Sequence, residues 1–189
     1  IFLSVIALVL LIIKAVEKEN VWMMISFPIF GVSLILLYLA STLYHSAKDP
    51  SKRFKLKIFD HAAIYVLIAG SYTPFTLVSL NGETGWFIFS IVWILAFTGI
   101  ILKLFFTGRF KLLSTAMYVL MGWLIVFYFK DLTANLHERG VFFLILGGIL
   151  YTIGAVLYSI KKIKFNHAIF HVFVLGGSFC HFLSIYLYI

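Results

Sequence analysis

The stretch WFIFSIVWILAFTGIILKLFF, residues 86–106, contains a single charged residue, Lys103. A run of about 20 predominantly apolar residues is what an α-helix needs to cross the hydrocarbon core of a bilayer. The whole chain shares this character, since 63% of its 189 residues are hydrophobic and only 12% are charged. Soluble domains are usually about half apolar and about a quarter charged. The composition therefore predicts an all-α integral membrane protein.

Six further apolar runs accompany this one, separated by short polar or basic segments. We expect helices over residues 1–13, 21–45, 58–80, 86–106, 112–129, 141–160 and 167–189. Residues 1–13 are short for a span, so we expect the first helix to be trimmed at its N-terminus. The prediction is one domain, residues 1–189, folded as a seven-transmembrane helix bundle.

Lysine and arginine are distributed unevenly among the connections of this arrangement. Eleven of the 15 lie in or beside the connections between helices two and three, four and five, and six and seven. These include a predicted basic loop over residues 48–57 and a basic link over residues 107–111. The positive-inside rule predicts that this end is cytoplasmic, with the N-terminus inside and the C-terminus outside. The net charge of +8 then reflects loops that face an anionic leaflet, and we expect no nucleic-acid partner.

Two histidines lie close together at the start of the last predicted helix, in the stretch Asn166-His167-Ala168-Ile169-Phe170-His171. Residues four apart on a helix lie on one face, about one turn from each other. Taken alone, this pair fits metal ligands and interhelical hydrogen bonding equally well.

The predicted orientation brings three more polar residues to the same cytoplasmic level. His45 ends the second helix with Ser41 one turn deeper, and Asp60 falls in the first turn of the predicted third helix. Taken singly, His45 fits an interfacial histidine, and Asp60 fits an acidic residue at a helix N-terminus. Polar residues that gather at one depth inside a membrane indicate a functional site.

Three neutral imidazoles are a common ligand set for catalytic zinc, which keeps a further position for water. We predict a zinc ion bound by His45, His167 and His171, since imidazole ligands favour zinc. Asp60 would hold the water or take its proton, and Ser41 would be a hydroxyl that either supports the ligands from behind or faces the substrate.

The remaining histidines and the single cysteine fit other roles. His61 lies about 100° around the helix from the aspartate before it, so we expect it beside the site or facing a loop. His137 falls in a polar outer loop. His181 lies about 21 Å along the helix axis from His167, which fits cavity lining or interhelical hydrogen bonding. Cys180 fits a small buried apolar residue.

Three motifs stand in order along the chain: Ser41-x-x-x-His45, Asp60-His61-Ala-Ala-Ile-Tyr-x-x-x-Ala-Gly-Ser-Tyr-Thr-Pro and His167-x-x-x-His171. In this order and spacing they resemble the hemolysin III branch of the progestin and adipoQ receptor family. The resemblance implies a seven-helix bundle with zinc at the three matching histidines, near the cytoplasmic face. Receptor-type members tend to carry tyrosine at the position of His61, so the resemblance favours a bacterial inner-membrane protein.

The family is grouped with the alkaline ceramidases, so the resemblance implies hydrolysis of a lipid amide or ester and a role in membrane lipid homeostasis. The expected partner is therefore a membrane lipid, as substrate or ligand. Two alternatives stay open: a non-enzymatic lipid sensor or receptor with a structural zinc, and a pore-forming cytolysin. The pore has less support, because the polar residues gather at one end of the helices.

Overall fold

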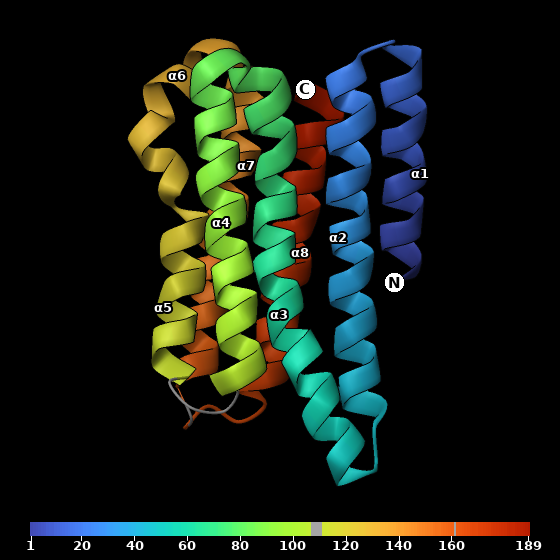
Figure 1. The fold of residues 1–189 in the computed structure, drawn as a ribbon, viewed down its shortest axis with the longest axis vertical. Coiled ribbons are helices and arrows are strands. Elements are labelled where there is room, and N and C mark those ends of the chain that lie inside the picture. Colours follow the sequence, from blue (N-terminus) through green and yellow to red (C-terminus); the bar gives the residue numbers. More distant parts are fainter. Residues whose placement is uncertain (107–110, 161) are drawn as a thin grey trace. The chain divides into compact units, whose positions relative to one another are not determined.

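The computed structural model describes residues 1–106, 111–160 and 162–189, which are predominantly helical (Figure 1). The predicted all-helical fold is confirmed. Two compact units make up the chain, Ile1–Phe110 and Lys111–Ile189. Residues 107–110 of the predicted basic link lie outside the described residues, as does Lys161.

The first unit is built from α1 (Phe2–Glu17), α2 (Val21–Ser46), α3 (Pro50–Pro74) and α4 (Gly82–Phe106). A π-helical segment, η1 (Phe75–Leu80), continues α3 up to Asn81. Each helix packs against the next one along the chain. Because short connections join them, consecutive helices run antiparallel (Figure 1).

The start of α3 differs from the prediction. The helix begins at Pro50, so the predicted basic loop over residues 48–57 is largely helical. The Asp49 side chain accepts a hydrogen bond from the Lys52 amide at 2.7 Å, and proline suits the first helical position. Asp60 therefore lies about three turns inside α3, and its predicted place in the first turn is wrong. A preference for acidic residues at helix N-termini no longer explains it.

The second unit contains α5 (Lys111–Gly122), a 3₁₀ segment η2 (Leu124–Tyr128), α6 (Phe129–Asn135), α7 (Glu138–Ser159) and α8 (Asn166–Tyr188). α8 packs along α7, and α5 also packs against α7. Side-chain hydrogen bonds join α7 to α8: Tyr151 with Ser178 at 2.9 Å, and Ser184 to the Gly140 carbonyl at 2.7 Å.

The fifth predicted helix is interrupted, and the loop predicted after it is wrong over residues 130–135. α5 ends at Gly122, and the chain returns to α-helix in α6. The Thr133 and Asn135 side chains donate hydrogen bonds to the carbonyls of Lys130 and Asp131, at 3.0 and 2.8 Å. Polar residues that suggested a loop thus bond to the backbone of a short helix.

Six helical stretches of the described chain are long and apolar enough to cross a membrane. They are Val21–Ser46, Pro50–Leu80, Gly82–Phe106, Leu113–Asn135, Glu138–Ser159 and Asn166–Tyr188. α1 has 16 residues, fewer than the about 20 that a bilayer core requires. The seventh span and the orientation therefore stay predictions.

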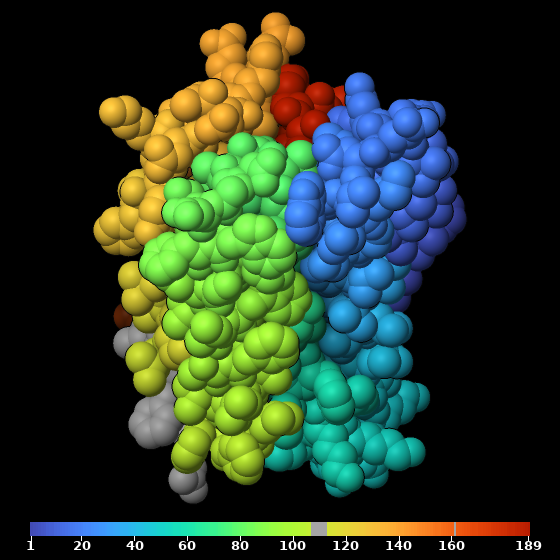
Figure 2. Space-filling model, turned by 45° about the horizontal axis from the view of Figure 1, so that its top comes forward, coloured from blue at the N-terminus to red at the C-terminus, as the bar shows by residue number. Residues whose placement is uncertain are grey.

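The surface of α4 has the character of a helix that faces lipid. Large apolar side chains are exposed along it, at Phe87, Ile94, Phe97, Ile101 and Phe105, and Figure 2 shows α4 at the surface of the first unit. Its buried residues recur every three or four positions on the other side: Ile88, Val92, Ala96, Gly99 and Lys103. This division is typical of a helix between a protein interior and a membrane.

Candidate metal centre

The first unit brings together three of the residues predicted for the site. Ser41 and His45 are one turn apart at the end of α2, and Asp60 lies on the neighbouring α3. Ser41 and Asp60 are buried, at 9% and 6% exposure. Their side chains share a hydrogen bond, and His45 is close enough to interact electrostatically with the Asp60 carboxylate. A buried carboxylate is costly unless such partners stabilise it.

The ring of His45 lies against Tyr44, a residue that was not predicted to belong to the site. The Tyr44 and His45 ring centroids are 4.7 Å apart, and the Arg53 guanidinium lies 5.5 Å from the centre of the Tyr44 ring. Arg53 reaches Tyr44 because α3 begins at Pro50, which places Arg53 on a helix beside the end of α2. This cation–π contact holds the side chain next to the histidine.

The second unit supplies the histidine pair. His167 and His171 lie in the first two turns of α8, with ring centroids 4.7 Å apart. The Tyr158 ring of α7 lies edge-on to His167 at 5.3 Å. The Asn166 side chain donates hydrogen bonds to the carbonyls of Tyr158 and Ile160, at 3.0 and 3.3 Å. These contacts fix the start of α8, and with it the pair, against the end of α7.

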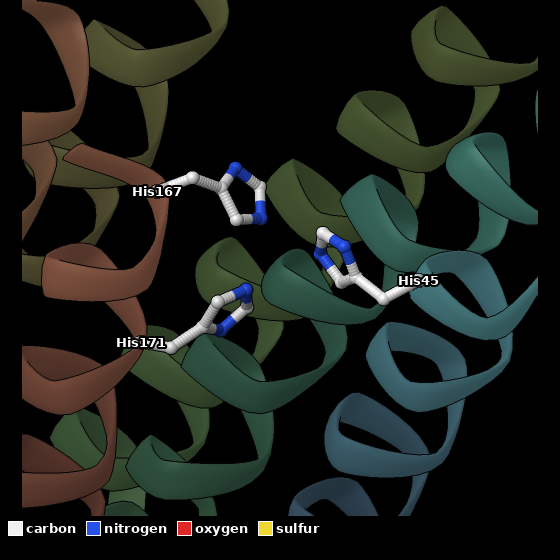
Figure 3. A group of neighbouring side chains, drawn as sticks. All are labelled: His45, His167 and His171. Carbon is white, nitrogen blue, oxygen red and sulfur yellow. The ribbon is translucent and has the colours of Figure 1, made fainter. Parts of the chain in front are cut away.

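His45, His167 and His171 form a group that could hold a metal ion (Figure 3). Each offers one ring nitrogen, and these nitrogens lie within 4.8 Å of one another. Figure 3 draws the three side chains, His45 on α2 and the pair on α8. A tetrahedral zinc ion with Zn–N bonds of 2.0–2.1 Å holds two nitrogens about 3.4 Å apart. The three ring nitrogens are donors of the kind that such an ion takes.

Comparison with known proteins gives the family. Residues 1–182 match the family model described as Haemolysin-III related. The chain belongs to the haemolysin III-related family. It is 52% identical over 188 residues to the Hemolysin-3 homolog of Bacillus subtilis (strain 168), over 100% of this chain and 88% of the relative. It is 48% identical over 187 residues to Hemolysin-3 of Bacillus cereus, over 99% of this chain and 85% of the relative.

A more distant relative comes from an animal. The Monocyte to macrophage differentiation factor of Homo sapiens is 28% identical over 184 residues, which cover 91% of this chain and 74% of the relative. The resemblance inferred from the three motifs is confirmed, and all three motifs lie within the matched residues. This haemolysin III-related chain is a multi-pass membrane protein and a homologue of the bacterial hemolysins III.

His181 occupies a different place in the second unit. It is 8% exposed and packs against Gly147 of α7, where a Cβ atom would collide with its ring. The Tyr151 ring lies edge-on to it, with centroids 5.2 Å apart. These contacts pack the His181 ring between α7 and α8, and its predicted role in cavity lining or interhelical hydrogen bonding stays a prediction.

The predicted burial of Cys180 and the predicted loop position of His137 are confirmed, whereas the side of the membrane on which His137 lies stays a prediction. Cys180 is buried as a free thiol. His137 is exposed next to α7, and its Nδ1 accepts a hydrogen bond from the Arg139 amide at 3.2 Å.

Proposed function

We propose that this haemolysin III-related protein is a zinc-dependent hydrolase that cleaves a lipid amide or ester within the membrane. The observation that supports this most is Asp60. Its carboxylate is buried within Pro50–Leu80, a helical stretch that is long enough to span a membrane. The carboxylate shares a hydrogen bond with Ser41 and interacts electrostatically with His45. Ionisable groups at such positions are costly in a membrane and mark functional sites.

The donor set fits zinc. Neutral imidazoles are preferred zinc ligands, and three of them leave a position for water or substrate. His45, His167 and His171 would hold the ion. When bound, zinc polarises a carbonyl group and lowers the pKa of water to about 7.

Asp60 has the character of the general base that such a hydrolysis needs. Its carboxylate would accept a hydrogen bond from the attacking water and take its proton as the water attacks the substrate carbonyl. The protonated Asp60 would then return this proton to the leaving amine or alcohol as the C–N or C–O bond breaks. The Ser41 hydroxyl shares a hydrogen bond with the carboxylate and so fixes the orientation of Asp60. Burial keeps bulk water away, which strengthens each of these interactions.

The surroundings of Asp60 favour a lipid over a sugar or a nucleotide. One and two turns deeper on the same face of α3, Ala63 and Leu67 are buried, at 7% and 4% exposure. Ser71 follows as a single hydroxyl. An acyl chain is compatible with such apolar surroundings, whereas a polar substrate would lose its hydration without gaining partners.

The positions of the three histidines in the chain favour a second function. In this alternative the protein is a lipid sensor or receptor, and the zinc is structural. His45 belongs to the first compact unit, and His167 and His171 belong to the second. An ion shared by all three would join residues more than 120 positions apart in the chain. Closed zinc sites commonly stabilise folds in this way.

A hydrolysis assay separates the two functions. We expect purified protein in lipid nanodiscs to release fatty acid from a ceramide-type amide or an ester lipid. Turnover should stop on chelation, return with added zinc and be lost in His171→Ala. The matched control is His137→Ala, which removes an exposed imidazole outside the histidine group and should retain turnover.

Two results would contradict the hydrolase. One is lipid hydrolysis that persists in zinc-free His171→Ala protein. The other is the absence of turnover from zinc-loaded wild type with every amide and ester lipid offered, which favours the sensor. Leakage from liposomes that survives loss of all three histidines would instead support a pore-forming cytolysin; the two Bacillus relatives carry the name hemolysin.

A further inference from the structure

A second face of α3 packs against α4 and does not contain Asp60. Tyr65 is 1% exposed and lies against Gly99, where a Cβ atom would collide with the tyrosine ring. Lys57 and His61 precede Tyr65 at intervals of four residues, so the three lie along one stripe of α3. Gly99 and Lys103 form the matching stripe on the buried side of α4.

The contact between Tyr65 and Gly99 fixes which residues face each other. Because α3 and α4 are antiparallel, the residue one turn before Tyr65 lies level with the residue one turn after Gly99. These two residues are His61 and Lys103. Lys57 lies one further turn along α3, and its charge is close enough to that of Lys103 for the two to repel. Three basic side chains therefore gather at one end of the α3–α4 interface.

The burial of these groups distinguishes them from ordinary surface lysines. Lys103 is only 6% exposed, and Lys57 and His61 are half-buried, whereas Lys52 and Lys55 of the same helix are exposed. Repulsion between two ammonium groups increases as water is excluded. A phosphate group between them replaces this repulsion with two charge-assisted hydrogen bonds, and the imidazole can add a third donor.

We propose that Lys57, His61 and Lys103 bind the phosphate of an anionic phospholipid headgroup. The surface beside Lys103 indicates that this phosphate belongs to a lipid. Leu104 and Phe105 are exposed, at 54% and 76%, on a helix whose outer face is apolar. Acyl chains can pack on this face while the headgroup lies at the basic cluster.

This site is independent of the proposed metal centre. Its residues all belong to the first compact unit, and His61 lies about 100° around α3 from Asp60. Lipid binding and lipid hydrolysis can therefore fail separately. The cluster also gives His61 a role that the sequence left open.

Titration of the detergent-solubilised full chain with phosphatidylglycerol, followed by native mass spectrometry, tests the proposal. We expect Lys103→Met and Lys57→Gln each to weaken binding about tenfold. Lys55→Gln is the matched control, since it removes an exposed charge two residues from Lys57 and should change binding less than about twofold. If Lys103→Met does not fold, Lys57→Gln decides the result.

Three outcomes would overturn the proposal. The first is wild-type affinity in both Lys103→Met and Lys57→Gln. The second is an equal loss in all three variants, which would indicate general attraction to a basic surface. The third is displacement of phosphatidylglycerol by millimolar inorganic phosphate, which would mean that the cluster binds the free ion and not the lipid. Phosphatidylcholine, whose headgroup has no net charge, should bind more weakly than phosphatidylglycerol.

Discussion

Asp60→Asn should lower lipid hydrolysis by a factor of about 10²–10⁴, the usual contribution of a general base. Asparagine has nearly the same shape as aspartate and can still hydrogen bond to Ser41, so the packing between α2 and α3 is kept. Its amide cannot accept the proton of the attacking water. The measurement is turnover under saturating lipid, beside the zinc content of the same preparation, which should equal that of wild type.

The matched control for this substitution is Asp131→Asn, an exposed acid in α6. It makes the same chemical change outside the site and should leave turnover within about twofold of wild type, as surface substitutions usually do. Wild-type turnover in Asp60→Asn would contradict the general-base role. Loss of zinc together with turnover would show that Asp60 acts on the metal site instead.

Removal of zinc should lower the free energy of unfolding by about 4 kcal/mol when free zinc is about a thousand times its dissociation constant. An ion that binds only the folded chain stabilises it by mass action, and this one would have ligands from both compact units. Thermal unfolding of wild type with and without a chelator measures the effect. The apparent melting temperature should fall on chelation and recover with added zinc.

His45→Ala serves as the internal control for this effect. A chain without the third ligand should already unfold at the lower temperature, and the chelator should shift it little further. If the chelator lowers the melting temperature of wild type and His45→Ala equally, the stabilising ion lies elsewhere. Since the sensor and the hydrolase both predict this stabilisation, the hydrolysis assay is what separates them.

Much of the helical fold could be read from apolar runs. Residues 141–160 and 167–189 were predicted within three residues of α7 and α8 at each end, because few other structures suit such runs. The spacing of His167 and His171 likewise places them on one face of any helix. Helical periodicity was therefore enough to predict that these two histidines lie side by side.

The start of α3 was missed although its signal is present in the sequence. The dense positive charge of residues 48–57 suggested a loop, but Asp49 followed by Pro50 is a standard beginning of a helix. The error had consequences for the site. With residues 48–57 taken as a loop, the contact between Arg53 and Tyr44 beside His45 could not be predicted. Asp60 was also wrongly placed in the first helical turn, where an acidic residue needs no functional explanation.

Other features depend on tertiary packing. Lys103 lies near the end of the predicted helix over residues 86–106, and the structure buries it on the side of α4 that bears Gly99. No local pattern shows this burial, since it follows from the packing of Tyr65 against Gly99. The break in the fifth predicted helix falls where the Trp123 indole donates a hydrogen bond to Thr152 of α7 at 2.9 Å, a contact between residues 29 positions apart.

The central claim, a zinc ion held by histidines from both units, is tested most directly by metal analysis of the purified chain. Inductively coupled plasma mass spectrometry should find about one zinc per wild-type chain and about one in His137→Ala. His45→Ala and His171→Ala should each fall to background, since loss of a ligand leaves too few donors for tight binding. Full zinc occupancy in either of these variants, or wild-type protein without zinc after purification in its presence, would contradict the proposed site.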